Sequence, residues 1–84
     1  PLAPAASLAT IRGEIKDQLE DGPGASKYYE IRKVDAKATA QKGIYAFKAW
    51  GDRVDDGDRT AVLITGSYNT KTQELEDTDE EEDS

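Results

Sequence analysis

Residues 28–68 contain the pattern that most restricts the fold of this chain. Val34, Ala36 and Ala38 alternate with polar residues, and a period of two is typical of a strand that buries one face. Residues 44–47 and 61–64 are apolar at every position, which is typical of strands covered on both faces. The sequence therefore predicts three strands, at residues 28–40, 44–50 and 60–68.

The sequence also predicts irregularities within these strands and the turns that connect them. Ile31 and Val34 have opposite parity, so a bulge or bend is predicted near residues 32–33. Gly43 can supply the positive φ that closes a hairpin between the first two strands. The second connection, residues 51–59, has the composition of a loop and is predicted to be longer.

A helix is predicted before the strands. Ser7 can accept a hydrogen bond from the first turn as an N-cap, and the Gly22-Pro23 pair can end the helix. Gly13 lies inside it and costs about 1 kcal/mol relative to alanine, so either a close backbone contact requires this glycine or the helix is marginal there. Four apolar residues recur at spacings of three, four and four, which places them on one stripe: Leu8, Ile11, Ile15 and Leu19.

These elements predict an α+β fold in which one N-terminal helix packs on a three-stranded antiparallel sheet, in the order α-β-β-β. All eight ionisable residues from Glu74 to Asp83 are acidic. Removing those eight charges from the net charge of −7 leaves +1 for residues 1–73. Because like charges repel, we expect a disordered acidic tail at 76–84. Residues 1–6 are rich in proline and alanine and are expected to form a flexible N-terminus, which leaves a single domain at 7–75.

The composition argues against several classes of function. The chain has no cysteine and no histidine, so it lacks thiolate zinc sites and the commonest general base and metal ligand. It contains no apolar run near the roughly 20 residues that span a membrane, and its N-terminus has no signal-peptide pattern. We expect a cytoplasmic protein that is not an enzyme and has no cofactor.

The four aspartates of residues 52–58 raise the question of calcium binding. If Asp52 is the first position of an EF-hand, Val54 occupies the third and Leu63 the twelfth, where oxygen ligands are required. The segment is therefore no EF-hand. A weak, irregular calcium site stays an alternative to an ordinary solvated turn.

Aromatic and basic residues are interleaved between positions 28 and 50. Exposed aromatic rings can stack on bases, worth roughly 1–3 kcal/mol per base, while lysine and arginine meet phosphates. Alternatively, the aromatic residues belong to the core and the lysines guard the sheet against edge pairing. The candidate binding residues are Tyr28, Arg32, Lys33, Lys37, Tyr45, Phe47, Lys48 and Trp50.

One arrangement loosely resembles the cystatins: a helix, then Lys37-Ala38, a turn and Gly43-Ile44-Tyr45, with Val62-Leu63-Ile64-Thr65-Gly66 further on. The inhibitor loop of that family has the form Gln-Val-Val-Ala-Gly, and the corresponding residues here, 39–43, share only the glycine. The glycine that usually precedes the helix is missing. The resemblance implies protease inhibition as a minor alternative and does not assign the chain to the family.

Two hypotheses for function follow. The first is a non-enzymatic interaction module that binds another protein through an exposed face or edge of the sheet, for example by strand addition. An accessory subunit, an inhibitor and a phage-type accessory or structural protein all belong to this class. The alternative is a protein that binds single-stranded nucleic acid through its aromatic and basic hairpin, with the acidic tail as a competitor. Self-association through a sheet edge is compatible with either hypothesis, and no membrane partner is expected.

Overall fold

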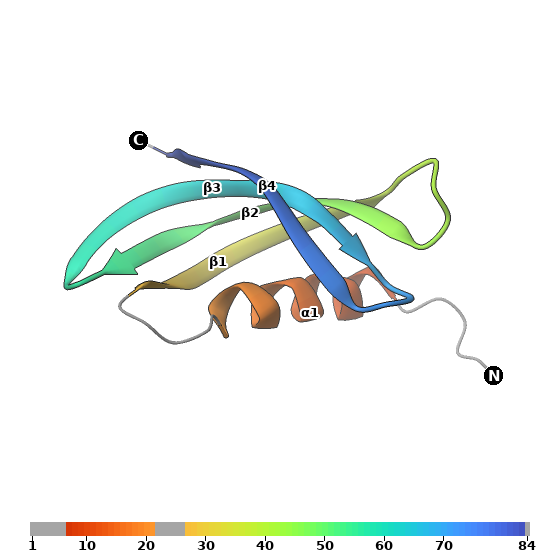
Figure 1. The fold of residues 1–84 in the computed structure, drawn as a ribbon, viewed down its shortest axis with the longest axis horizontal. Helices are drawn as coiled ribbons and strands as arrows, with labels where there is room; N and C mark the ends of the chain where they lie inside the picture. Colours follow the sequence, from red (N-terminus) through yellow and green to blue (C-terminus); the bar gives the residue numbers. More distant parts are fainter. Residues whose placement is uncertain (1–6, 22–26, 84) are drawn as a thin grey trace.

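The computed structural model describes residues 7–21 and 27–83 of the chain. One helix precedes four strands, and the sheet arches over the helix (Figure 1). The strands form a single antiparallel sheet in the order β1-β2-β3-β4. The predicted class, a helix packed on an antiparallel sheet, is confirmed, whereas the predicted number of three strands is wrong. The elements are α1 (Leu8–Glu20), β1 (Lys27–Ala38), β2 (Ile44–Asp55), β3 (Asp58–Asn69) and β4 (Glu74–Glu82).

The helix begins where the sequence predicts. The Ser7 hydroxyl accepts a hydrogen bond from the backbone N–H of Thr10 at 3.2 Å. Three residues of the predicted stripe are buried, whereas Leu8 is 46% exposed. Leu8 is the first helical residue, and the part of the stripe that packs on the sheet begins one turn later. Gly22, Pro23 and the predicted flexible residues 1–6 lie outside the described residues.

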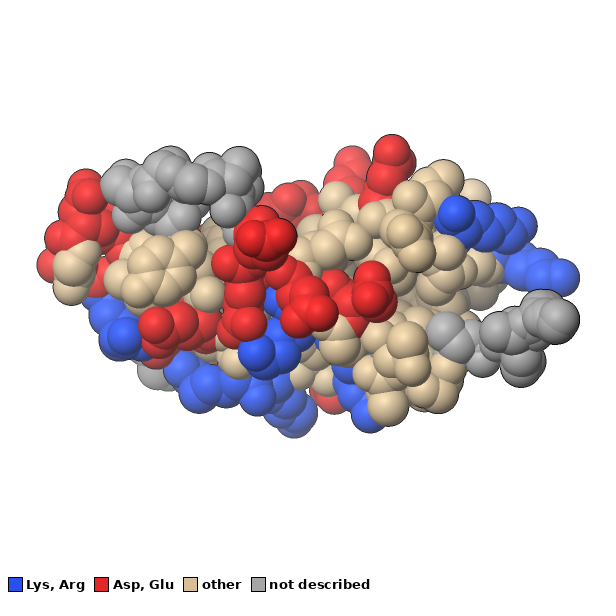
Figure 2. All heavy atoms as spheres, turned by 90° about the horizontal axis from the view of Figure 1, so that it is seen from below, with Lys and Arg blue, Asp and Glu red and all other residues tan. Residues whose placement is uncertain are grey.

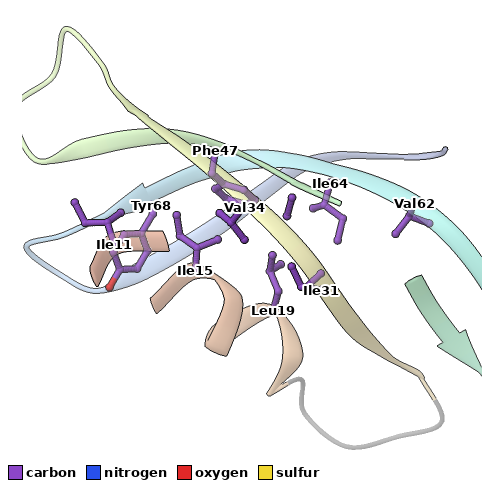
Figure 3. Packing of buried hydrophobic residues seen from close by; sticks show 10 residues of the cluster. Ile11, Ile15, Leu19, Ile31, Val34, Phe47, Val62, Ile64 and Tyr68 are labelled. Atoms are coloured by element: carbon purple, nitrogen blue, oxygen red, sulfur yellow. The ribbon is translucent and has the colours of Figure 1, made fainter. Parts of the chain in front are cut away.

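The hydrophobic core lies between α1 and the face of the sheet that covers it. Figure 3 shows Ile11, Ile15 and Leu19 on the helix directed toward side chains of the sheet. Ile15 is fully buried, and burying one such aliphatic side chain stabilises a fold by roughly 1.5–3 kcal/mol. The strands contribute Ile31, Val34, Phe47, Ala49, Val62, Ile64 and Tyr68 to this cluster.

The first hairpin has the irregularities that the sequence predicts. The register of β1 against β2 shifts between Ile31 and Lys33, so Arg32 is the extra residue of a β-bulge. The bulge allows apolar residues of both parities to face α1. Gly43 has a φ of +88° in the following turn.

The second hairpin differs from the prediction of a longer loop at residues 51–59. Strands β2 and β3 pair without interruption as far as Asp55 and Asp58. The turn consists of Asp56 and Gly57, with φ values of +51° and +92°. An Asp-Gly pair tolerates positive φ at both positions, which a two-residue hairpin turn needs. The loop-like composition of this segment therefore belongs to two extended strands and a tight turn.

The predicted disorder of the acidic tail is wrong for residues 76–82, which belong to β4. This strand pairs with β3 from Asn69 opposite Glu74 to Val62 opposite Glu82. Leu75 packs against the core, and the Gln18 side chain of α1 donates to the carbonyl of Gln73 in the preceding turn at 2.8 Å. Backbone pairing and these contacts offset the repulsion among the carboxylates.

No helix among the described residues is long and apolar enough to cross a membrane.

Candidate functional site

The register of the sheet divides the predicted binding residues between its two faces. Paired residues of adjacent strands share a face, and Phe47, at 3% exposed, lies in the core on the face covered by α1. Tyr45 shares that parity and packs against the core. Neither aromatic ring belongs to the opposite face, which we call the outer face. The register places Tyr28, Lys33, Lys37, Lys48 and Trp50 on the outer face.

The outer face carries a cation–π pair at its centre. The Lys33 ammonium lies 4.8 Å from the centre of the Trp50 ring. Lys37 and Lys48 are exposed on the same face, and Tyr28 is 46% exposed near one end of it. Four of the predicted cations and aromatic rings therefore share the outer face on strands β1 and β2, with Lys33 and Trp50 in contact, and Tyr28 lies farther along.

The bulged residue Arg32 belongs to a network of ion pairs. Its guanidinium lies 2.9 Å from Asp52, and Arg59 bridges Asp52 at 2.9 Å and Glu30 at 2.6 Å. Hydrogen bonds from Arg32 and then Arg59 hold the pKa of Asp52 below its usual value. Asp52, a residue of β2, is therefore paired with two arginine side chains. Within residues 7–21 and 27–83, no group of three or more acidic side chains is placed to hold a metal ion.

A second polar cluster lies on the helix side of the sheet and was not predicted from the sequence. The Tyr29 hydroxyl donates to the Glu80 carboxylate, and the Arg53 guanidinium forms an ion pair with the same carboxylate. Together these three residues connect β1, β2 and β4, although 51 positions separate Tyr29 from Glu80. Figure 2 shows acidic side chains beside basic ones near the middle of the molecule as seen from below. No local sequence signal could have paired residues so far apart.

The β1 edge is capped at Ile31, beside the bulge, by the end of α1. The backbone N–H of Ile31 donates a hydrogen bond to the Glu20 carboxylate at 2.8 Å. The Lys16 ammonium donates to the same carboxylate, also at 2.8 Å. Burial raises the pKa of Glu20, but the hydrogen bonds from Lys16 and Ile31 outweigh it and leave the pKa below its usual value. The charged carboxylate therefore caps the strand edge next to the bulge at Arg32.

The second half of the β1 edge has no such cover among the described residues. The Thr39 N–H donates to the carbonyl of Ile44 at 3.2 Å, toward β2. Because backbone groups alternate in direction along a strand, those of Val34, Ala36 and Ala38 point away from β2. The strand order places no described strand on that side. We call residues 34–38 the open segment.

Small side chains and charges surround the open segment. Asp35, Lys37 and Ala38 are exposed, and Ala36 is half-buried. An open hollow of about 590 Å³ borders the open segment at Ala36. Its other lining residues include Arg12, Ala46 and Gly66. Ala36 and Ala46 have small side chains and Gly66 has none, so these three positions do not fill the hollow.

The opposite edge of the sheet, β4, resists pairing with a similar strand. Seven of its nine residues are acidic, and the register against β3 shifts between Thr65 and Gly66. Inserted charges and bulges are the means by which edge strands avoid uncontrolled pairing. The two edges therefore differ: β4 carries acidic side chains along its length, whereas the cap on the β1 edge is at Ile31, beside its bulge.

No protein-family model, curated protein or solved structure matches the chain. The loose resemblance to cystatins thus gains no support, and the function has to be inferred from the geometry of this chain.

Proposed function

We propose that this protein is a non-enzymatic interaction module that binds an extended segment of a partner protein by strand addition to the open segment of β1. The observation that carries this proposal is the contrast along one strand. The Ile31 N–H is capped by Glu20, whereas the backbone groups of residues 34–38 that point outward have no strand beside them among the described residues. In strand addition, main-chain hydrogen bonds provide affinity and alternate side chains provide specificity.

The open segment offers a matched set of backbone groups. Val34, Ala36 and Ala38 each provide one N–H donor and one C=O acceptor. Each such hydrogen bond contributes about 0.5–1.5 kcal/mol net, so a short segment can give measurable affinity when the side chains also fit. Asp35 and Lys37 are exposed beside it and can discriminate between partners by charge.

Ala36→Pro tests the proposal. Because the Ala36 N–H points away from β2, proline removes one donor of the open segment and leaves the pairing with β2 intact. The probes are peptides selected against the wild-type protein from a random twelve-residue library. We expect A36P to weaken their binding at least tenfold, measured by calorimetry, and bound peptide to slow hydrogen exchange at the amides of Val34, Ala36 and Ala38.

The matched control is Ala36→Ser, which retains the backbone N–H and should bind the peptides like the wild-type protein. Circular dichroism checks that both variants remain folded. Binders that ignore A36P, or a selection that yields no binder although the wild-type protein is a monomer, would contradict strand addition at this edge.

A second candidate function is binding of single-stranded nucleic acid on the outer face. The observation that favours it is the Lys33–Trp50 pair with Lys37 and Lys48 exposed nearby. Against it, the register places Glu76, Asp79 and Glu81 of β4 on the same face, where they repel phosphate.

Trp50 is the only tryptophan of the chain, so its fluorescence reports on this surface directly. If the second candidate is right, oligo-dT should quench Trp50, Lys48→Glu should weaken the effect, and affinity should fall steeply as salt rises. Unchanged fluorescence at low salt would eliminate nucleic acid as a ligand of the outer face.

A further inference from the structure

The open segment is complementary to a second copy of itself. Its centre reads Asp35-Ala36-Lys37, with opposite charges on the two sides of a small residue. We infer that the partner at this edge is a second copy of the chain, joined about a two-fold axis through Ala36 so that the two sheets become one eight-stranded sheet. This inference rests on the proposed function, because it uses the same open segment.

The antiparallel geometry determines which charged residues lie opposite one another across the contact. A two-fold axis at Ala36 places this residue opposite Ala36 of the second copy. Asp35 then lies opposite Lys37 of the second copy, and Lys37 opposite Asp35 of the second copy. Both side chains are exposed on the outer face, and opposite charges at directly opposed positions stabilise a strand pair. One C2 contact therefore contains the same favourable pair twice.

The backbone groups fit the same register. Val34, Ala36 and Ala38 direct their N–H and C=O groups outward. With the axis at Ala36, Val34 lies opposite Ala38 of the second copy and Ala36 opposite Ala36, so outward-directed groups meet outward-directed groups, as a hydrogen-bonded pair requires. A register in which they lie opposite residues of the other parity would also turn the side chains to the wrong face.

Neighbouring registers are less favourable. An axis at Asp35 places Asp35 opposite Asp35 of the second copy, and an axis at Lys37 does the same for Lys37. Like charges at directly opposed positions destabilise a strand pair. An axis at Val34 would bring the bulged Arg32 into the pairing, next to the edge that Glu20 caps. Among the axes from Val34 to Lys37, the pattern of charge and the bulge together select Ala36.

Charge reversal provides the test, with the mass of the full chain in solution measured by sedimentation velocity at low salt over a range of concentrations. The wild-type protein should form a dimer and no larger species. Asp35→Lys and Lys37→Asp each place like charges opposite one another twice, so each should raise the dimer dissociation constant about tenfold or more.

Two combinations test the register itself. The double variant D35K/K37D restores both opposite-charge pairs and should dimerise like the wild-type protein. An equal mixture of D35K and K37D should form a heterodimer, although neither variant dimerises well alone. Lys71→Asp, in the turn before β4, changes the net charge as K37D does and should leave the dimer unchanged.

The outcomes separate this inference from the proposed function. A wild-type monomer at every concentration, together with peptide binding that A36P abolishes, overturns the dimer and retains strand addition. Assemblies larger than a dimer, or a dimer unaffected by D35K and K37D, would mean another contact, such as β1 on the acidic β4 edge, and would also overturn it. Peptide binding that ignores A36P contradicts the proposed function whatever the mass.

Discussion

Gly51 shows how one residue limits the geometry of this sheet. It lies in β2 opposite Ile31, beside the bulge of β1. A Cβ at this position would lie 2.2 Å from the backbone oxygen of Glu30, closer than any real contact. Gly13 in α1 is the opposite case, because an added Cβ there has no atom within 4 Å among those described. Of the two explanations for Gly13, a required close contact is therefore eliminated.

Alanine at the two glycines should have opposite effects. Gly51→Ala forces the backbones of β1 and β2 apart and should lower the free energy of unfolding by about 1–3 kcal/mol or more. Gly13→Ala removes a residue of poor helix propensity and should raise it by up to about 1 kcal/mol. Urea melts of both variants measure the two values. A neutral G51A would contradict the close approach at the bulge.

At the scale of elements, β4 is held by residues far from it in the chain. Glu80 receives the Tyr29 hydroxyl and the Arg53 guanidinium, and Leu75 packs on the core. Burial and the hydrogen bond to Glu80 raise the pKa of Tyr29 well above its ordinary value of 10.0. Folding therefore favours the protonated phenol, and this contribution is complete below pH 10 and is lost as pH rises from there toward the raised pKa.

Tyr29→Phe should show this pH dependence. At pH 7 the variant lacks the hydrogen bond to Glu80 and should be less stable by about 1 kcal/mol. At pH 11 the unfolded wild-type chain is stabilised by ionisation of Tyr29, by about 1.4 kcal/mol per pH unit above its ordinary pKa. The difference between the two proteins should shrink or reverse between pH 7 and pH 11, as measured by urea melts. A constant difference would show that the hydroxyl does not hold its proton in the fold.

The local sequence pattern predicts the elements that have a periodic arrangement of apolar residues. It fails for elements whose structure depends on contacts with residues far away in the sequence. The stripe of α1 and the alternation of β1, with its bulge, are visible in the sequence because buried positions recur at fixed spacings. By contrast, β4 has the composition of a disordered tail, and its order depends on contacts with Tyr29 and Arg53. Likewise, the Asp56-Gly57 turn lies within a charged segment that resembles a longer loop.

At the scale of the whole molecule, the candidate site depends on strand order. The sequence indicates which residues are aromatic or basic, but the register decides that Trp50 and Lys33 share a face and that Phe47 does not. The open segment is defined by what lies beside β1 in the assembled sheet. The lack of a neighbouring strand among the described residues is not marked by any residue type, so composition alone could not have located the open segment.

The strand order has one more consequence, for the way the chain reaches this structure. Each strand pairs its backbone with the strand next to it in the sequence, so each hairpin of the sheet starts from a short turn. Closing a short loop costs less entropy than closing a long one, and topologies built from contacts near in sequence fold faster than those that pair distant segments. The hairpin with the two-residue turn at Asp56 is the least costly closure of the sheet.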